Sequence, residues 1–140
     1  MEFLTKQQMF DKAAAGVIAQ GGPSSVGEGR QCLYIKEQGD KTLHCGVGHL
    51  LANNEMRKAW DENGYIAGHL IGRACTEDDL RNSGIEPTVE NDIFLGELQC
   101  AHDQANNSFV LDFMRAFVCK MREIADHYKL DASILDKEAK

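Results

Sequence analysis

The sequence predicts a mainly helical α+β fold, in which one β-hairpin packs with an N-terminal helix and an antiparallel pair of C-terminal helices. Two observations support this prediction. Apolar residues recur with a helical period at both ends of the chain, and the stretch 31–45 between them has the pattern of two short strands joined by a polar turn. The length of 140 residues suits a single domain, 1–140, and we expect 130–140 to form a loose tail.

The first helix is predicted to begin after Thr5, which can cap it, with Gln8 as the capping-box partner. Pairs of apolar residues then recur every four positions from Met9 to Ile18, and this spacing makes one apolar stripe on a helix. The sequence Gly21-Gly22-Pro23 ends the helix, because glycine supplies the left-handed turn and proline cannot continue the helix.

The stretch 31–45 predicts the hairpin, since two runs of strand-forming residues flank a polar turn that contains glycine. If Gln38 and Gly39 form the loop, Cys32 lies directly opposite Cys45. Directly opposed side chains have Cβ atoms roughly 5 Å apart. This register therefore predicts two neighbouring thiols.

Short helices are predicted to connect the hairpin to the C-terminal half, one over 55–61 and one that Thr76 caps. A longer helix begins after Thr88. The sequence Asn106-Asn107-Ser108 breaks it and caps the last helix, which has the strongest helical period in the chain. Two helices joined by so short a break are expected to pack antiparallel.

Charge and composition exclude several classes of function. The chain carries 22 acidic and 15 basic side chains, and the net charge of −7 argues against a general nucleic-acid surface. Apolar runs are too short to span a bilayer and the first residues lack the pattern of a secretory signal, so we expect no membrane partner. The five cysteines include no Cys-x-x-Cys pair, which favours free thiols in the reducing cytoplasm.

Cysteine and histidine side chains supply two candidate sites. The first is a zinc site, whose ligands would be Cys32, Cys45, His49 and His102. If both cysteines are instead core residues, we expect no cofactor. The second is a thiol-dependent hydrolase or transferase that uses Cys45, or alternatively Cys32, with His102 and Asp103. Adjacent residues on a helix point about 100° apart, so Asp103 is not expected to orient His102, and no cysteine stands at a predicted helix start.

Glycines and aromatic residues supply the binding candidates. Gly46-Val47-Gly48 lies between a strand and a helix, where glycines can cradle phosphate; the alternative is a tight strand exit. Exposed aromatic residues beside arginine mark partner surfaces, and the alternative is ordinary core packing. The predicted binding residues are Tyr34, Gly46, Gly48, His49, Trp60 and Arg73.

The order of several motifs resembles a group of small uncharacterised proteins from phages and prophages. The shared features are Cys32-x-Tyr34 in a strand, Cys45-x-Val47-Gly48-x-Leu50 at a strand exit, a later Leu98-Gln99-x-x-His102-Asp103, and a helical C-terminal end. This resemblance implies a phage or mobile-element origin and action in the cytoplasm of a bacterial host cell. It implies no activity.

A shorter stretch is similar to the catalytic hairpin of phage-type lysozymes. In that family a glutamate precedes a hairpin aspartate and a threonine, ahead of Gly-Ile-Gly-His-Leu, and this chain has Gly46-Val47-Gly48-His49-Leu50. The similarity implies Glu28 as the acid, with Glu37 in place of the aspartate and His44 in place of the threonine. The spacing departs by one residue, and the helical half lacks the rest of the lysozyme pattern.

Together these patterns predict a non-catalytic phage or mobile-element accessory protein that binds a bacterial host component. The component is expected to be a host protein, as in counter-defence, or a small nucleotide. The alternative is a small hydrolase, either thiol- or metal-dependent at Cys32, Cys45 and His102, or lysozyme-like at Glu28 and Glu37. A homo-oligomer with ligand pockets at its interface is a further form that such a binding module can take.

Overall fold

The structure, a computed structural model, describes residues 2–22, 25–26, 31–38, 40–106 and 112–139. Its helices are α1 (Lys6–Gln20), α2 (Asn54–Asn63), α3 (Ala74–Asn82), α4 (Val89–Asn106) and α5 (Phe113–Tyr128), with 3₁₀ helices η1 (Gly48–Leu50) and η2 (Ser133–Ala139). Its strands are β1 (Ser25–Val26), β2 (Gln31–Cys32), β3 (Lys36–Gln38) and β4 (Lys41–Leu43). Strand β1 pairs with β2 and β3 pairs with β4, both antiparallel. The predicted class, mainly helical α+β with one β-hairpin, is confirmed.

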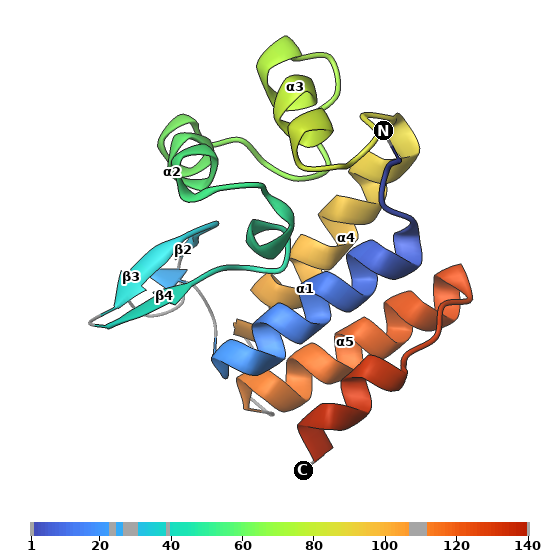
Figure 1. The fold of residues 1–140 in the computed structure, drawn as a ribbon. Helices are drawn as coiled ribbons and strands as arrows, with labels where there is room; N and C mark the ends of the chain where they lie inside the picture. Colours follow the sequence, from blue (N-terminus) through green and yellow to red (C-terminus); the bar gives the residue numbers. More distant parts are fainter. Residues whose placement is uncertain (1, 23–24, 27–30, 39, 107–111, 140) are drawn as a thin grey trace.

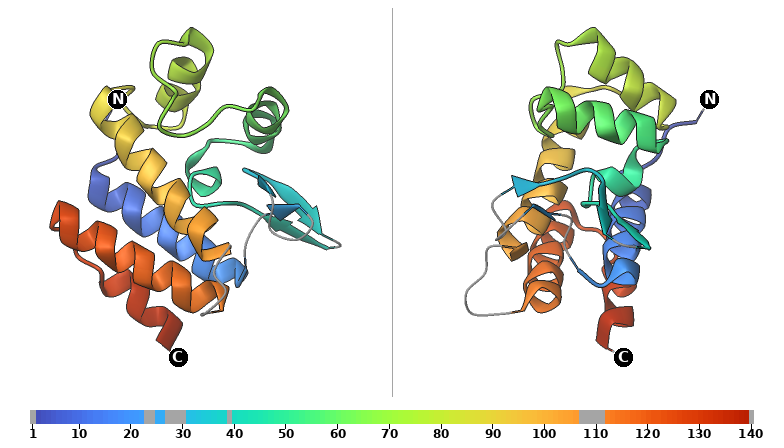
Figure 2. Two further views of the ribbon diagram at one scale, coloured as in Figure 1. Left: turned by 180° about the vertical axis from the view of Figure 1, so that it is seen from behind. Right: turned by 90° about the vertical axis from the view of Figure 1, so that its left-hand side faces the viewer.

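Helices α1, α4 and α5 lie side by side, and α4 and α5 run in opposite directions as predicted (Figure 1). Helices α2 and α3 lie beyond one end of this helical group, and the hairpin lies at its side (Figure 2). The C-terminal segment η2 packs against α1 and α5. Leu135 in this segment is buried, so this part of the predicted tail is packed rather than loose.

The start and end of α1 follow its sequence signals. The Thr5 backbone N–H donates to Gln8 Oε1 at 2.8 Å, and the Gln8 backbone N–H donates to Thr5 Oγ1 at 3.1 Å. Gly21 ends the helix with a φ of 77°, and its N–H donates to the Val17 carbonyl. The buried residues of α1 form the predicted stripe, namely Met9, Phe10, Ala13, Ala14 and Val17.

The predicted register of the hairpin is wrong. Gln38 pairs with Lys41, and Cys32 pairs with Ser25 of β1 instead of lying opposite Cys45. The predicted strand is also interrupted, because the Asp61 carboxylate of α2 accepts the backbone N–H groups of Tyr34 at 2.9 Å and Ile35 at 3.2 Å. These amides are therefore bound to a side chain, and the long strand that the sequence suggests is split into β2 and β3.

Two helix starts also differ from the prediction. Helix α3 begins at Ala74, because the buried Thr76 hydroxyl donates to the Leu70 carbonyl at 2.6 Å instead of capping the helix. This places Cys75 in the first turn of α3, where no cysteine was expected. Helix α5 is capped by Asp112, whose side chain accepts the Arg115 N–H at 2.9 Å, and not by the predicted break at 106–108.

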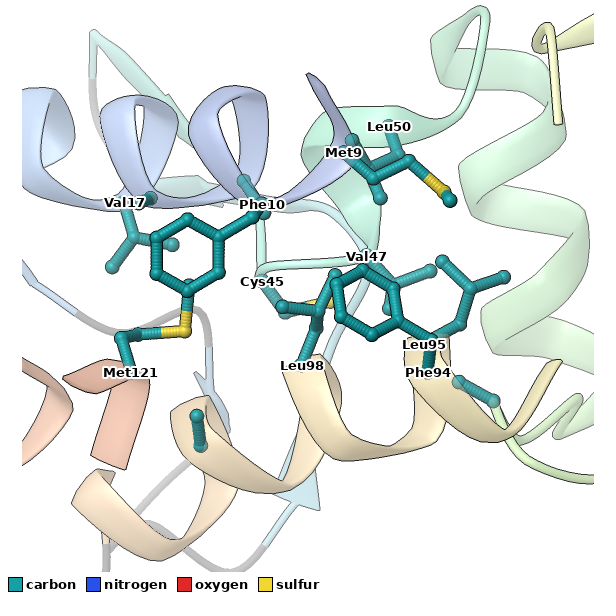
Figure 3. Packing of buried hydrophobic residues seen from close by; sticks show 14 of the residues in the cluster. Met9, Phe10, Val17, Cys45, Val47, Leu50, Phe94, Leu95, Leu98 and Met121 are labelled. Atoms are coloured by element: carbon teal, nitrogen blue, oxygen red, sulfur yellow. The ribbon is translucent and has the colours of Figure 1, made fainter. Parts of the chain in front are cut away.

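The core lies where α1, α4 and α5 meet the segment that follows the hairpin (Figure 3). Phe10 of α1 and Met121 of α5 face each other across it, and Cys45 and Val47 enter it beside Leu98 of α4. Because this segment carries buried residues into the core, it anchors the hairpin to the helices. No helix in the described part of the chain has the length and apolar content to cross a membrane.

Candidate functional site

The strand exit, residues 45–51, is buried and tightly packed. A side chain at Gly48 would overlap the Tyr34 carbonyl oxygen, and a Cβ at Gly46 would lie 3.4 Å from the Leu98 carbonyl oxygen. The Gly48 N–H donates to Cys45 Sγ at 3.3 Å, and the His49 N–H donates to the Cys45 carbonyl at 3.1 Å. The glycines therefore allow close backbone packing, which is the geometry of a tight strand exit.

Cys45 has no exposed surface. Burial raises the pKa of its thiol to about 12, so the thiol is protonated at neutral pH. The reactive form of cysteine is the thiolate. Cys45 is therefore poorly suited to act as a nucleophile and well suited to fill the core as a small apolar residue.

His44 and His49 meet edge to face at the strand exit, with ring centroids 5.0 Å apart. Gln20, the last residue of α1, holds both residues. Its Oε1 accepts the His44 backbone N–H at 2.9 Å and lies 3.0 Å from His49 Nε2, while its Nε2 donates to the His44 carbonyl at 2.6 Å. Burial, followed by the nearby His44 side chain, lowers the pKa of His49 to about 3, so the ring is neutral at physiological pH.

Arg57 of α2 fixes the strand exit from the other side. Its guanidinium donates to the carbonyls of Gly48 at 2.5 Å and Leu51 at 2.6 Å, and to Asn54 Oδ1 at 2.6 Å. This role of Arg57 could not be predicted, because no sequence pattern near Arg57 indicates a hydrogen bond to the carbonyl of Gly48, nine positions earlier. The charged residue in this region is thus bound within the protein.

Asp103 does orient His102, contrary to the expectation from helix geometry. His102 is fully buried, and its Nδ1 lies 3.2 Å from Asp103 Oδ1. Gln99, one turn earlier on α4, donates from Nε2 to the same Asp103 oxygen at 2.9 Å. The rotatable side chain of Asp103 thus reaches back along the helix, although the two Cα–Cβ bonds diverge.

No group of three or more His, Cys, Asp or Glu residues among the described positions is placed to hold a metal ion. Cys45, His49 and His102 therefore do not form such a group. The Cys32 side chain lies outside the described side chains, so the complete zinc set stays a prediction.

The two lysozyme-like carboxylates cannot be compared directly, because Glu28 lies outside the described residues. Glu37 lies on β3 with an exposed side chain, and Lys58 Nζ approaches its carboxylate at 3.6 Å. It borders a hollow of about 400 Å³ that Asp61 also lines.

A second hollow, which we call the aromatic pocket, has a volume of about 260 Å³ and opens where α2 and α4 approach Tyr34. Its lining residues are Tyr34, Trp60, Asp61, Gly64, Tyr65, Ile66, Gln99 and Asp103. Trp60 meets Tyr34 and Tyr65 edge to face, with ring centroids 5.3 and 6.2 Å apart. Tyr65 is half-buried and contributes accessible surface to the wall, whereas Tyr34 is 7% exposed and Trp60 is fully buried, so these two rings lie behind that surface and pack in the core.

Hydrogen bonds fix the aromatic wall. The Tyr34 hydroxyl donates to the Tyr65 carbonyl at 2.6 Å and accepts the Ala67 N–H at 3.2 Å. The Trp60 indole N–H donates to Asp79 Oδ2 at 2.7 Å. Burial raises the pKa of Tyr34 well above its ordinary value, so its hydroxyl stays neutral. These hydrogen bonds fix the positions of the Tyr34 and Trp60 side chains.

The polar part of the pocket is acidic. Burial raises the pKa of Asp61, while its hydrogen bonds from Tyr34 and Ile35 act in the opposite direction. The Gln99 Nε2 donates a hydrogen bond to Asp103, and the buried Oε1 of Gln99 has no hydrogen-bond partner within the described part of the chain. The pocket therefore combines two carboxyl groups, an amide whose acceptor is unused, and aromatic rings.

The predicted binding residues divide between these two regions. Tyr34 and Trp60 line the aromatic pocket, and the Arg73 guanidinium lies 4.6 Å from the centre of the Tyr65 ring. Gly46, Gly48 and His49 lie in the strand exit instead. Sequence reasoning did not assign Asp61, Gln99 or Asp103 to a binding site. The spacing of Gln99 and Asp103, four residues apart on a helix, was the available signal.

The chain was compared with protein-family models, with curated proteins and with solved structures, and none of them matches it.

Proposed function

We propose that this chain is a non-catalytic accessory protein of a phage or mobile element that binds a bacterial host protein through the aromatic pocket. The observation that carries the proposal is the half-buried Tyr65 ring beside two carboxyl groups and the exposed Ile66 side chain, on a wall that the buried Tyr34 and Trp60 hold by hydrogen bonds. Aromatic residues are enriched where one protein binds another, in an apolar centre surrounded by a polar rim.

The chemistry of the strand exit supports binding over thiol catalysis. The Cys45 thiol is buried, and burial raises its pKa to about 12. The neutral His49 ring is bound to Gln20, and burial lowers its pKa to about 3. Neither group is poised for acid–base or nucleophilic work near pH 7.

A protein partner fits the pocket better than a nucleotide does. Two carboxyl groups line the pocket, and none of its described lining residues is basic, so a phosphate would meet repulsion. The volume of about 260 Å³ lies below the range of roughly 300–1,000 Å³ that is typical of sites for drug-sized ligands. Ile66 at its edge is 60% exposed, and protein interfaces bury such apolar residues at their centre.

The test compares what two surface variants retain from a bacterial lysate. Ile66→Glu changes the edge of the pocket, and Ile93→Glu makes the same change at another exposed apolar position, where 52% of Ile93 is exposed. We expect one host protein to be retained by the unchanged chain and by Ile93→Glu but not by Ile66→Glu. Calorimetry with that purified protein then gives its Kd. Retention that is the same for both variants would contradict the proposal.

A lysozyme-like glycosidase is the second candidate. It is favoured by Glu37, which borders the same hollow as Asp61, a carboxyl whose pKa is raised by burial. Glycoside hydrolysis uses one ionised carboxylate and one carboxyl of raised pKa. If this function holds, the protein clears a suspension of purified bacterial cell walls, and both Glu28→Gln and Glu37→Gln abolish the clearing. A suspension that stays turbid with the unchanged protein would exclude it.

A further inference from the structure

We propose that the aromatic pocket takes the guanidinium group of an arginine, presented by a basic segment of the partner protein. This inference rests on the proposed function, because it assumes that the pocket is where the partner binds. It adds the chemistry of the docking group, which the proposed function leaves open.

The charges of the pocket favour a cation. Asp61 and Asp103 bring carboxyl groups to its lining, and no described lining residue carries a positive charge. The whole chain has a net charge of −7, so the field around the protein attracts a basic segment over a longer range. Electrostatic complementarity of this kind increases the rate of association and discriminates against acidic partners.

The aromatic wall favours a planar cation. The guanidinium of Arg73 already lies over the Tyr65 ring, 4.6 Å from its centre, so a ring of this wall accepts such a group within the chain itself. Arginine stacks on aromatic faces and presents donors in a plane, whereas lysine carries a compact, strongly hydrated charge.

The hydrogen-bonding capacity of the pocket also fits a donor. The Tyr34 hydroxyl is already used both as donor and as acceptor. What remains is acceptor capacity on the Asp61 and Asp103 carboxylates, whereas the Oε1 of Gln99 is buried behind the lining. A guanidinium offers five N–H donors and no acceptor. Ile66, exposed at the edge, is placed to cover the apolar stem of an arginine side chain.

The experiment titrates the isotope-labelled protein with three small probes and follows two NMR signals, the Trp60 indole N–H and the Gln99 side-chain amide. The probes are N-acetyl-arginine N-methylamide, the citrulline compound of the same shape without the charge, and AMP. Both residues lie at the pocket: the Trp60 indole N–H, which donates to Asp79, reports changes in the packing behind the wall, and the Gln99 amide, which donates to Asp103, reports changes at the carboxylate.

We expect the arginine probe to shift both signals in a saturable way and the other two probes to leave them unchanged. Equal or stronger shifts with the citrulline compound or AMP would overturn the arginine assignment and leave the pocket as a binding site. If no probe shifts either signal, both the arginine assignment and the pocket as the binding site are overturned.

Two variants separate charge from shape. Asp103→Asn removes one charge but keeps an acceptor for Gln99, and we expect it to weaken binding of the arginine probe roughly fivefold, the effect of one partly exposed ion pair. Asp126→Asn removes one negative charge from an exposed position of α5 that does not line the pocket. This variant should bind the arginine probe with unchanged affinity. Tyr65→Leu removes the ring without changing the charge and should also weaken binding. Equal affinities across all three variants would contradict the inference.

Discussion

The strand exit and the aromatic pocket are neighbouring regions that both contain polar and aromatic side chains. They differ in how completely these side chains are buried and bound within the chain. Tyr34 belongs to both, since its carbonyl oxygen contacts Gly48 and its ring lines the pocket. At the strand exit the thiol, both imidazoles and Arg57 are bound to partners within the chain. In the pocket the wall is fixed, but acceptor capacity and an exposed apolar side chain are left over.

This difference shows that chemically reactive residue types do not by themselves mark a site. Cysteine, histidine and glycine gather at the strand exit because the chain must turn there within a crowded core. The pocket is built from residues with less obvious chemistry, and its two carboxylates accept hydrogen bonds within the chain while they line an open hollow. We therefore expect changes at the strand exit to affect mainly stability and changes at the pocket to affect mainly binding.

The largest effect is expected from Gly48→Ala, because the new methyl group would overlap the Tyr34 carbonyl oxygen. Overpacking of this kind should lower the free energy of unfolding by about 3 kcal/mol, as measured by urea denaturation. Gly22→Ala is the matched control, since a Cβ there meets nothing within 4 Å and its effect should stay within about 0.5 kcal/mol. Equal losses in the two variants would contradict the account of the strand exit.

The next effect is a loss of stability in acid that depends on His49. The pKa of His49 is about 3 in the folded protein and close to its ordinary value of 6.5 after unfolding. As the pH falls below 6.5, His49 becomes protonated in the unfolded chain but stays neutral in the folded chain. The free energy of unfolding therefore decreases between pH 6.5 and 3. Between pH 7 and 5 the contribution is about 2 kcal/mol.

Urea denaturation at pH 7 and at pH 5 measures this contribution. His49→Gln should reduce the difference in unfolding free energy between the two pH values. His127→Gln, which changes an exposed histidine of α5, should leave the difference as it is. If His49→Gln has the same pH dependence as the unchanged protein, His49 is not the group responsible.

A smaller effect is expected at Cys45. Replacement by alanine removes a buried sulfur and the acceptor of the Gly48 N–H, and should cost about 1 kcal/mol of unfolding free energy. Cys119→Ala, at an exposed position of α5, should cost almost nothing. Complete unfolding of Cys45→Ala at room temperature would instead indicate that Cys45 holds a metal or another linkage.

The smallest effect on stability is expected at the edge of the pocket. Ile66→Ser replaces a side chain that is 60% exposed, so the free energy of unfolding should change by less than about 0.5 kcal/mol. Thermal melting monitored by circular dichroism checks this. A loss as large as that of Cys45→Ala would place Ile66 in the structural part of the protein and remove the distinction between the two regions.

Features of the fold that depend on local sequence could be predicted. Thr5 and Gln8 cap α1, Gly21 ends it, and Thr88 accepts the Asn91 N–H at the start of α4. Each of these interactions joins residues at most four positions apart, so the sequence contains both partners. The helical stripes of α1 and α5 were predictable for the same reason.

Features that depend on distant contacts could not be predicted. The Asp61 carboxylate lies 27 positions after Tyr34, and no sequence pattern indicates that it binds the Tyr34 amide and so limits the strand. Thr76 looked like a helix cap, but the burial of its hydroxyl against the Leu70 carbonyl decides its role. Tyr34 and Trp60 were recognised as binding candidates, whereas their meeting with Gln99 depends on the packing of α4.

The most direct test that the partner binds at the pocket is photo-crosslinking inside bacterial cells. Benzoylphenylalanine is placed at position 66 in one variant and at position 93, another exposed isoleucine, in the other. We expect one discrete covalent adduct with a host protein from position 66 and none from position 93. The absence of an adduct from position 66, or the same adducts from both positions, would contradict binding at the pocket.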